Sequence, residues 1–249
     1  MSAARDPVAE PALADLAVFR PVKTGNTFEE TVERLAQAVK LGVVPKGGRL
    51  PAERELAERL NVSRVTLREA IKALQQAGFV ESRRGRAGGT FVTYDANQRR
   101  TGNARKVVRS MGSDEVHDAL DFRAVVEPGA AELAARRDLD AGARRYLCES
   151  LDRVANASPD HHRVADSRLH LAIAELSGSA SLAGAVTDVQ MRLNELLGAI
   201  PVLGRNIEHS NAQHDAVVRA ILAGNDRKAR AAMQQHVDAT AALLRGFLA

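Results

Sequence analysis

The stretch Gly48–Val92, GRLPAERELAERLNVSRVTLREAIKALQQAGFVESRRGRAGGTFV, decides the fold of the N-terminal part of the chain. Residues 52–60 have the apolar spacing of a short amphipathic helix, and the turn Asn61-Val62-Ser63 follows them. Ser63 is placed to cap a second helix, which we predict over residues 64–77. The predicted inner face of this second helix consists of Leu67, Ala70, Ile71 and Leu74.

A β-hairpin is predicted to follow these two helices. Residues 79–82 and 90–93 have the residue types of strands, and the basic, glycine-rich segment RRGRAGG joins them. Another helix, with an apolar stripe, is predicted earlier in the chain over residues 27–41. Three helices followed by a hairpin is the order of elements in a winged helix-turn-helix, in which the hairpin is the wing.

The helix over residues 64–77 is the candidate recognition helix, because the second helix of this motif enters the major groove of DNA. Its first turn would present Arg64, Thr66 and Arg68, and arginine can bind a guanine edge or a phosphate through two parallel hydrogen bonds. Arg54 on the preceding helix could contact the DNA backbone. Gly85 would let the tip of the wing approach a groove closely.

The charge distribution favours DNA binding over the alternative of a solvated helix surface with ordinary ion pairs such as Glu55–Arg59. The 249 residues carry a net charge of +4. Residues 18–110 contain 19 Lys and Arg against 9 Asp and Glu, whereas residues 111–249 contain 15 against 19. A basic segment joined to a mildly acidic one is typical of a nucleic-acid-binding module attached to another domain. Aromatic residues make up only 3% of the chain, which argues against stacking of single-stranded bases.

The cysteine content and the hydropathy exclude several other classes of protein. The single cysteine, Cys148, excludes an internal disulfide framework and a CxxC zinc ribbon, and it fits a reducing environment. No apolar run approaches the roughly 18 residues that a membrane span needs, and the N-terminus lacks the features of a signal peptide. We therefore expect a cytoplasmic protein that has no membrane partner.

The pattern along the chain predicts a mainly α-helical protein in four parts. We expect a mobile tail over residues 1–17, the winged helix-turn-helix over 18–94, a linker over 95–112 with one short helix within 104–111, and an all-α bundle over 113–249. The bundle helices are predicted near residues 114–136, 140–156, 160–177, 179–199, 207–223 and 226–247.

The histidines of the C-terminal part suggest a metal site. Asp166 and His170 are spaced i, i+4, which places a carboxylate and an imidazole on one face of a helix. His214 and His236 lie on two later predicted helices, in apolar surroundings that predict inward-facing side chains. One Asp and three His would suit Zn²⁺, Ni²⁺, Mn²⁺ or Fe²⁺, with zinc as our first choice. The alternative, an ordinary hydrogen-bonded or solvated side chain, is our expectation for the remaining histidines, His117, His161, His162 and His209. For His161 and His162, which lie beside Pro159 and Asp160, we expect solvated side chains in a loop.

The N-terminal motifs resemble the winged helix-turn-helix of GntR-family bacterial transcription regulators. The resemblance rests on LPAEREL, VSRVTLREA, AGFV and RRGRAGGTFV, which together span about 45 residues. By position, it implies DNA contacts at Arg54, Ser63, Arg64, Thr66, Arg68, Arg84 and Gly85. Val65 lies at a position where the family varies.

The C-terminal motifs resemble the FCD domain, the helical ligand-binding domain of the FadR subfamily. They are DFRAVVE, DSRLHLAIAELSGS and EHSNAQHDAVVRAILAGNDRKARAAMQQHV, and the segment ARKVVRSM favours the seven-helix form of the domain. The resemblance implies that Asp166, His170, His214 and His236 bind a divalent metal on the floor of a pocket for small carboxylates. This chain departs from the family pattern at Leu169 and Ser179, which alters the shape of the pocket and so bears on the effector.

Two arginines, Arg123 and Arg192, could balance the charge of an effector carboxylate. The alternative for Arg123 is an i, i+4 ion pair with Glu127.

The combined expectation is a homodimeric regulator, taken to be a repressor, that binds a palindromic DNA operator and responds to a small organic acid. A metal-dependent enzyme that uses the Asp/His site and a direct metal sensor are the alternatives. No HExxH motif or nucleophile elbow supports the enzyme.

Overall fold

The structure, a computed structural model, describes residues 27–85, 88–96, 113–200 and 204–248. The chain divides into two compact units, Met1–Ala96 and Asn97–Ala249, and each is described by itself. The described residues are mainly helical, as predicted. The predicted mobile tail, most of the predicted linker and the short helix expected within residues 104–111 lie outside the described residues.

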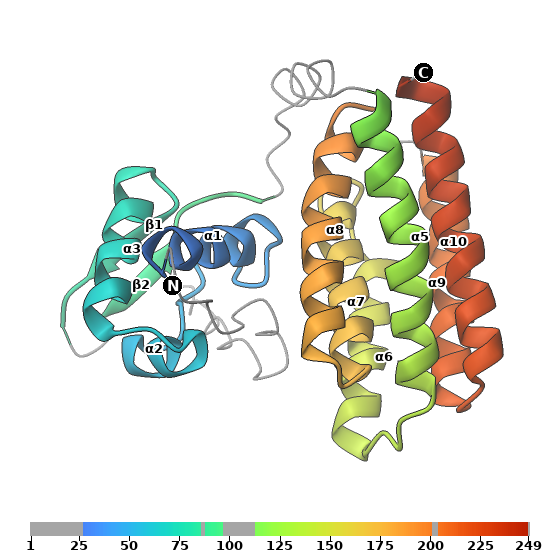
Figure 1. The fold of residues 1–249 in the computed structure, drawn as a ribbon, viewed down its shortest axis with the longest axis horizontal. Coiled ribbons are helices and arrows are strands. Elements are labelled where there is room, and N and C mark those ends of the chain that lie inside the picture. The colour runs from blue at the N-terminus through green and yellow to red at the C-terminus, as the bar shows by residue number, and fades with distance from the viewer. Residues whose placement is uncertain (1–26, 86–87, 97–112, 201–203, 249) are drawn as a thin grey trace, which may run out of the picture. The chain divides into compact units, whose positions relative to one another are not determined.

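The first unit has the predicted order of three helices and a hairpin (Figure 1). Its elements are α1 (Thr27–Lys40), α2 (Glu53–Leu60), α3 (Arg64–Gln76), β1 (Val80–Arg83) and β2 (Gly89–Val92). The two strands are antiparallel, with Val80 opposite Val92 and Arg83 opposite Gly89. Helix α3 packs against α1, α2 and β1, so the candidate recognition helix is fixed by the rest of the unit.

Helix α3 begins and is buried as its sequence predicts. The Ser63 hydroxyl accepts a hydrogen bond from the backbone N–H of Thr66, which satisfies a donor at the free N-terminus of the helix. The buried residues are the four of the predicted inner face, Leu67, Ala70, Ile71 and Leu74. After the helix the chain turns at Gly78, whose φ of +76° is a conformation that glycine adopts readily.

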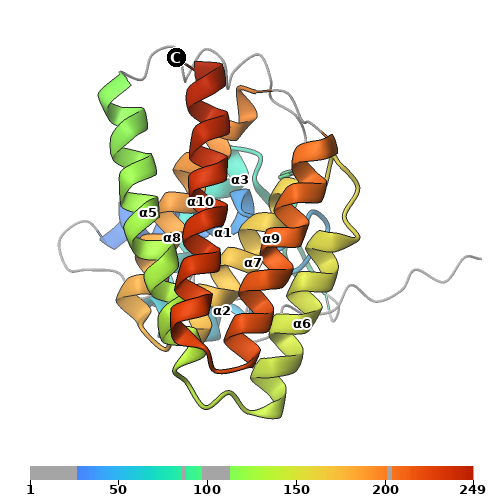
Figure 2. The same ribbon diagram turned by 90° about the vertical axis from the view of Figure 1, so that its right-hand side faces the viewer.

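In its described part, the second unit is a bundle of six helices (Figures 1 and 2). They are α5 (Ser113–Ala135), α6 (Ala141–Ala155), α7 (His162–Leu176), α8 (Ala180–Gly198), α9 (Gly204–Leu222) and α10 (Asp226–Leu248). Helix α10 packs against α5 and α9, and α7 packs against α5, α6 and α8. The N-termini of α6 and α8 are capped by the side chains of Asp140 and Ser179.

Two groups of buried apolar side chains hold the bundle together. The larger group includes Ala131, Leu169, Val217 and Met233, and the smaller one includes Leu120, Leu193, Ile200 and Leu244. Several buried polar side chains, among them Arg123 and Glu127, lie between the two groups along α5, and His236 lies at the corresponding level of α10. The bundle therefore contains a polar layer between two apolar ones.

Within the described part of the chain, no helix combines the length and the apolar character that crossing a membrane would require.

Candidate functional site

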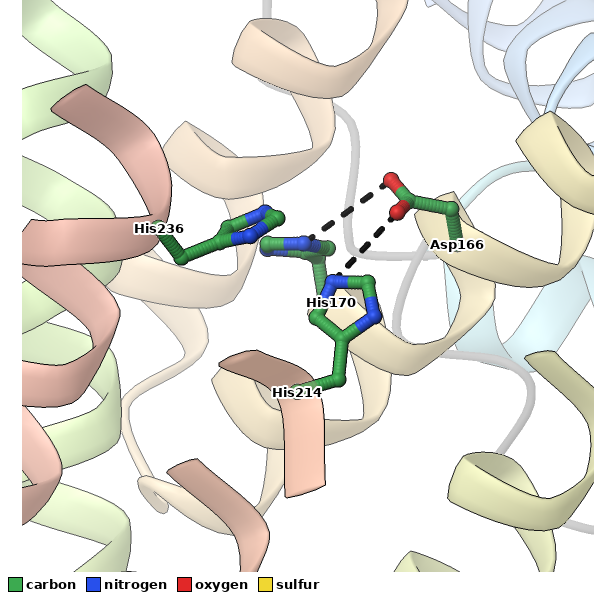
Figure 3. Close-up of side chains that lie close together, drawn as sticks. All are labelled: Asp166, His170, His214 and His236. Atoms are coloured by element: carbon green, nitrogen blue, oxygen red, sulfur yellow. Dashed lines mark ion pairs between the residues drawn. The ribbon is translucent and has the colours of Figure 1, made fainter. Parts of the chain in front are cut away.

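The polar layer of the bundle contains a cluster of four possible metal ligands. Asp166 and His170 come from α7, His214 from α9 and His236 from α10. Each offers one ligand atom, and these four atoms lie within 4.8 Å of one another. Figure 3 shows the three imidazole rings and the carboxylate turned toward a common centre. The structure thus brings together all four of the ligands that the sequence predicts.

The distances within the cluster are those of groups that share one small site. Asp166 Oδ1 lies 3.3 Å from His214 Nε2, and Asp166 Oδ2 lies 3.8 Å from His170 Nε2. The three rings have centroid separations of 4.4 to 5.4 Å. All three histidines are buried, and only Asp166 is partly exposed. Such a closely packed set of donors is suited to a single ion.

Two of the histidines are oriented by side chains behind them. Glu127 Oε2 lies 3.0 Å from His170 Nδ1, and Gln213 Oε1 lies 3.2 Å from His236 Nδ1. A carboxylate or amide oxygen at Nδ1 favours the tautomer with its proton there, which places the lone pair on Nε2, the atom that would bind a metal. Gln190 Nε2 in turn donates to Glu127 Oε1 at 2.6 Å. The sequence analysis did not assign this supporting role to Glu127, Gln190 or Gln213.

Arg123 joins the supporting layer to the ligands. Its Nε donates to Glu127 Oε2 at 3.0 Å, so the i, i+4 pair considered from the sequence is present. Its Nη2 lies 3.3 Å from His236 Nε2. The residue is only 1% exposed, and Nη1 has no hydrogen-bond partner among the described residues. Arg123 therefore holds one unused donor in the interior of the bundle.

The electrostatics of the layer favour a charged carboxylate and neutral imidazoles. Burial alone would raise the pKa of Glu127, but Arg123, His170 and Gln190 together lower it to about 2. Burial lowers the pKa of His214 to about 4 against the opposing effect of Asp166. Burial, reinforced by the neighbouring His214 and His170, also lowers the pKa of His236 well below its usual range. Neutral imidazole is the form that binds metals.

The donor set passes a simple test for a divalent metal. Both ring nitrogens of His214, and Nε2 of His170, lack a hydrogen-bond partner among the described residues although they are buried. Leaving a buried polar atom unpaired is costly, so an ion that accepts these lone pairs would relieve the cost. Three imidazoles and one carboxylate suit zinc, nickel, manganese or iron. Asp166, His170, His214 and His236 are the residues that would hold the ion.

A cavity of about 60 Å³ opens beside the cluster. Arg123, Asp166 and His236 contribute to its wall, so two of the candidate ligands and the buried arginine face the same space. Its apolar lining consists of Pro159, Leu193, Leu197, Ile200, Ile207 and Leu243. The remaining lining residues are His162, Arg163, Asn206, Ser210 and Thr240.

The other candidate effector residue, Arg192, lies elsewhere. Its side chain is half exposed, its Nη1 is 3.8 Å from Asp118 Oδ2, and it is absent from the described lining of the cavity. The structure therefore brings Arg123, but not Arg192, to the cluster.

The predicted solvation of His162 was wrong. The sequence suggested a solvated side chain in a loop, but α7 begins at this residue and its side chain is 7% exposed. It belongs to the cavity wall, and its Nε2 lies 3.1 Å from Asn211 Oδ1. The other three histidines expected outside the site, His117, His161 and His209, are exposed.

The candidate DNA contacts lie at the surface of the first unit. Arg54, Ser63, Arg64, Arg68, Arg84 and Gly85 are exposed, and Thr66 is half-buried. At the tip of the wing, Gly85 has a φ of +105°, and among the described residues beyond its chain neighbours no atom lies within 4 Å of where a Cβ would be. The backbone there is open to close approach, and a side chain would strain it. Val65, at the variable position, is 66% exposed on the first turn of α3.

Three of these candidates are held in place by neighbouring side chains. Arg68 Nε donates to Glu53 Oε2 at 2.7 Å, which fixes the guanidinium beside the N-terminus of α2. The hydroxyls of Ser63 and Thr66 are 2.8 Å apart, so they form one polar patch at the start of α3. The expected Glu55–Arg59 ion pair is also present, at 2.9 Å, and Arg59 is thereby directed along α2.

Comparisons with known proteins agree with this two-part organisation. Residues 27–92 match the family described as bacterial regulatory proteins, gntR family, and residues 118–239 match the FCD domain. The chain is 30% identical to the "Putative HTH-type transcriptional regulator RmpR" of Mycobacterium gastri over an alignment of 237 residues. This alignment covers 92% of this chain and 84% of that protein. It is 31% identical to the "Putative L-lactate dehydrogenase operon regulatory protein" of Escherichia coli K12 over an alignment of 226 residues. This alignment covers 84% of this chain and 83% of that protein.

A solved structure shares the fold. Escherichia coli McbR/YncC aligns with a TM-score of 0.54 and 17% identity over 90% of this chain and 99% of that one. The family and the matched relatives are transcriptional regulators and not enzymes, which removes the alternative of a metal-dependent enzyme. The chain therefore belongs to the GntR family of bacterial transcriptional regulators and, through its FCD domain, to the FadR subfamily.

Proposed function

We propose that this protein is a homodimeric repressor of transcription that acts in the cytoplasm. In this proposal, its affinity for a palindromic operator falls when a small carboxylate binds beside a divalent metal, with zinc as the first candidate, in the FCD domain. The observation that carries the proposal is the cluster of Asp166, His170, His214 and His236 next to a cavity. The wall of this cavity includes Asp166, His236 and the buried Arg123.

Residues in the cavity wall and behind it would together hold an anion. Arg123 has a buried Nη1 without a partner among the described residues, and an anion in the cavity would satisfy it. Glu127 keeps that guanidinium in place and orients His170. When bound, a divalent ion would supply positive charge and an open coordination position for a carboxylate oxygen. The same layer would therefore recognise both the ion and the acid.

The DNA-binding half of the proposal rests on the surface of α3 and the wing. Arg64 and Arg68 are suited to guanine edges or phosphates, and the hydroxyls of Ser63 and Thr66 are suited to phosphates. Two copies related by a two-fold axis would read the two halves of a palindrome. Coupling between the effector and the operator in such proteins is typically about 1–3 kcal/mol, or roughly 5–150-fold in affinity.

The proposal is tested by locating the operator and then titrating it. Nuclease footprinting on DNA upstream of the protein's own gene and its neighbours would define a site, which we expect to be a palindrome. Fluorescence anisotropy of that DNA with metal-loaded protein would then measure the response to a series of small carboxylates. We expect at least one acid to weaken binding by about fivefold or more.

The controls distinguish the proposed carboxylate-responsive repressor from the remaining alternative, a direct metal sensor. If a chelator releases the DNA and carboxylates have no effect on metal-loaded protein, the metal is the signal and the carboxylate proposal is wrong. If operator affinity is indifferent to the metal but falls with an acid, the sensor alternative is wrong. Protein that binds neither a palindrome nor any acid would contradict the proposal as a whole.

A further inference from the structure

His162 continues the row of functional side chains along α7. It precedes Asp166 by four residues and His170 by eight, so the three side chains lie on one face of the helix at successive turns. The first of them lies in the cavity wall, and the other two belong to the ligand cluster. Because His162 is not one of the clustered ligands, the metal site gives no reason for its burial.

The contact with Asn211 determines what His162 can offer to a ligand. The carbonyl oxygen Oδ1 of Asn211 is an acceptor, so the imidazole Nε2, 3.1 Å away, is the donor. A neutral imidazole with its proton on Nε2 has a lone pair on Nδ1. Nδ1 is therefore the acceptor that His162 can offer, and a hydroxyl is a matching donor.

The lining of the cavity combines polar and apolar side chains. His162 and Asp166 from α7, with Asn206 and Ser210 from α9, contribute polar groups. Apolar lining comes from Leu193 and Leu197 of α8, Ile200 just after α8, Ile207 of α9 and Leu243 of α10. A ligand that fits this lining carries both polar groups and hydrocarbon.

Volume and charge restrict the ligand further. A cavity of about 60 Å³ holds roughly four to six water-sized groups, which corresponds to a short acid. Nη1 of Arg123 is a buried donor that an anion in the cavity would satisfy. The other arginine in the wall, Arg163, already donates from Nη2 to the backbone oxygen of Ile200 at 3.2 Å. One carboxylate, rather than two, matches this arrangement.

We propose that His162 is a specificity-determining residue that accepts a hydrogen bond from a hydroxyl of the effector. The effector is accordingly a short monocarboxylic acid that bears a hydroxyl and a hydrocarbon group. This inference rests on the proposed function, because it assumes that the cavity is the effector site. It adds the chemical class of the acid and the residue that reads its hydroxyl.

The test compares acids of equal carbon number with and without the hydroxyl. Calorimetry on the metal-loaded full-length protein at about pH 8, where an ordinary imidazole is neutral, would use lactate against propionate and 2-hydroxybutyrate against butyrate. We expect the hydroxylated acid of each pair to bind about tenfold more tightly, since a missing partner leaves a buried acceptor unpaired. We also expect malonate and succinate to bind more weakly than lactate.

Three variants assign the preference to His162. In His162→Phe the preference should disappear while the metal content, measured by elemental analysis, stays at the wild-type level. His162→Asn places a carboxamide oxygen near the position of Nδ1 and should keep a preference. His161→Phe changes the neighbouring, exposed histidine and should behave as the wild type.

The failures of the two proposals are distinguishable. Equal binding of hydroxylated and plain acids by the wild type, a preference that survives His162→Phe, or tighter binding of the dicarboxylates would overturn this inference. In each of these cases release of the operator by an acid would still support the proposed function. If no acid binds or none releases the operator, the proposed function itself is wrong, and this inference with it.

Discussion

Replacing Glu127 with glutamine removes the charge that balances Arg123 while keeping the shape of the side chain. Both side chains are buried, and their contact is 3.0 Å. The fall of the Glu127 pKa from 4.5 to about 2 corresponds to about 3 kcal/mol at neutral pH. Breaking a buried ion pair by removing one partner costs a similar amount, about 3–5 kcal/mol. We therefore expect Glu127→Gln to lower the unfolding free energy of the metal-free bundle by about 3 kcal/mol.

The same substitution should weaken the metal site. Glu127 orients His170 through Nδ1, and loss of such a supporting carboxylate typically reduces metal affinity by about 10–100-fold. Denaturant unfolding followed by circular dichroism would give the free energy, and hydrogen exchange would assign the transition to the bundle. Competition with a chromophoric chelator would give the metal affinity.

Glu132→Gln is the matched control for this experiment. Glu132 lies on the same helix and pairs with Arg136 and Arg230, but these arginines are about half exposed, so the loss should stay below about 1 kcal/mol. The pH dependence provides a sign check. The contribution of Glu127 to the unfolding free energy is complete above pH 4.5 and is lost as the pH falls through about 2. The unfolding free energies of the wild type and of Glu127→Gln should therefore converge in acid. If Glu127→Gln matches the control in both stability and metal affinity, the reasoning is refuted.

Four further outcomes are expected. His214→Ala and His236→Ala should each lower the metal content and abolish the response to acids while the DNA-binding unit of each variant still binds DNA. Unchanged metal content in both variants by elemental analysis would contradict the site. Arg64→Ala should weaken operator binding and reduce the salt slope by about 1, whereas Arg59→Ala, whose guanidinium is paired along α2, should change the slope little. Ser63→Ala should destabilise the DNA-binding unit by about 1 kcal/mol through loss of the α3 cap, and an unchanged denaturation midpoint would count against that role. Because the folded pKa of His214, about 4, lies below the ordinary 6.5, the metal-free protein should lose stability as the pH falls from 6.5 through about 4, and a flat profile in that range would argue against the buried neutral ring.

The sequence predicts best what local spacing determines. The buried face of α3 follows from apolar residues at helical intervals, and Ser63 caps that helix because a hydroxyl at this position reaches the free backbone donors. The ligand types were also accessible, since Asp166 and His170 share a helical face. The convergence of His214 and His236 depends on how α9 and α10 pack. The sequence indicated only that both side chains face inward, and the resemblance to a family supported their convergence.

The residues that the sequence missed are those whose role comes from other helices. Gln190 and Gln213 have no distinctive spacing, and each gains its role from a side chain on a different helix. His162 was misjudged because the neighbouring Pro159 and Asp160 suggested solvated side chains, whereas α7 begins at His162 and its side chain is buried. Its spacing of four residues from Asp166 was a signal that could have identified it. Arg192 has the right charge but pairs with Asp118 away from the cavity.

The four candidate ligands are spread over α7, α9 and α10, and in a metal-loaded protein this distribution would affect the lifetime of the protein in the cell. An ion held by all four would act as a cross-link between segments up to 70 residues apart, which the folded bundle binds and the unfolded chain does not. At a free metal concentration 100 times the dissociation constant, such binding adds about 2.7 kcal/mol to the unfolding free energy. Metal starvation would then expose the chain to proteases, so the abundance of the regulator, as well as its response to an acid, would follow the metal supply.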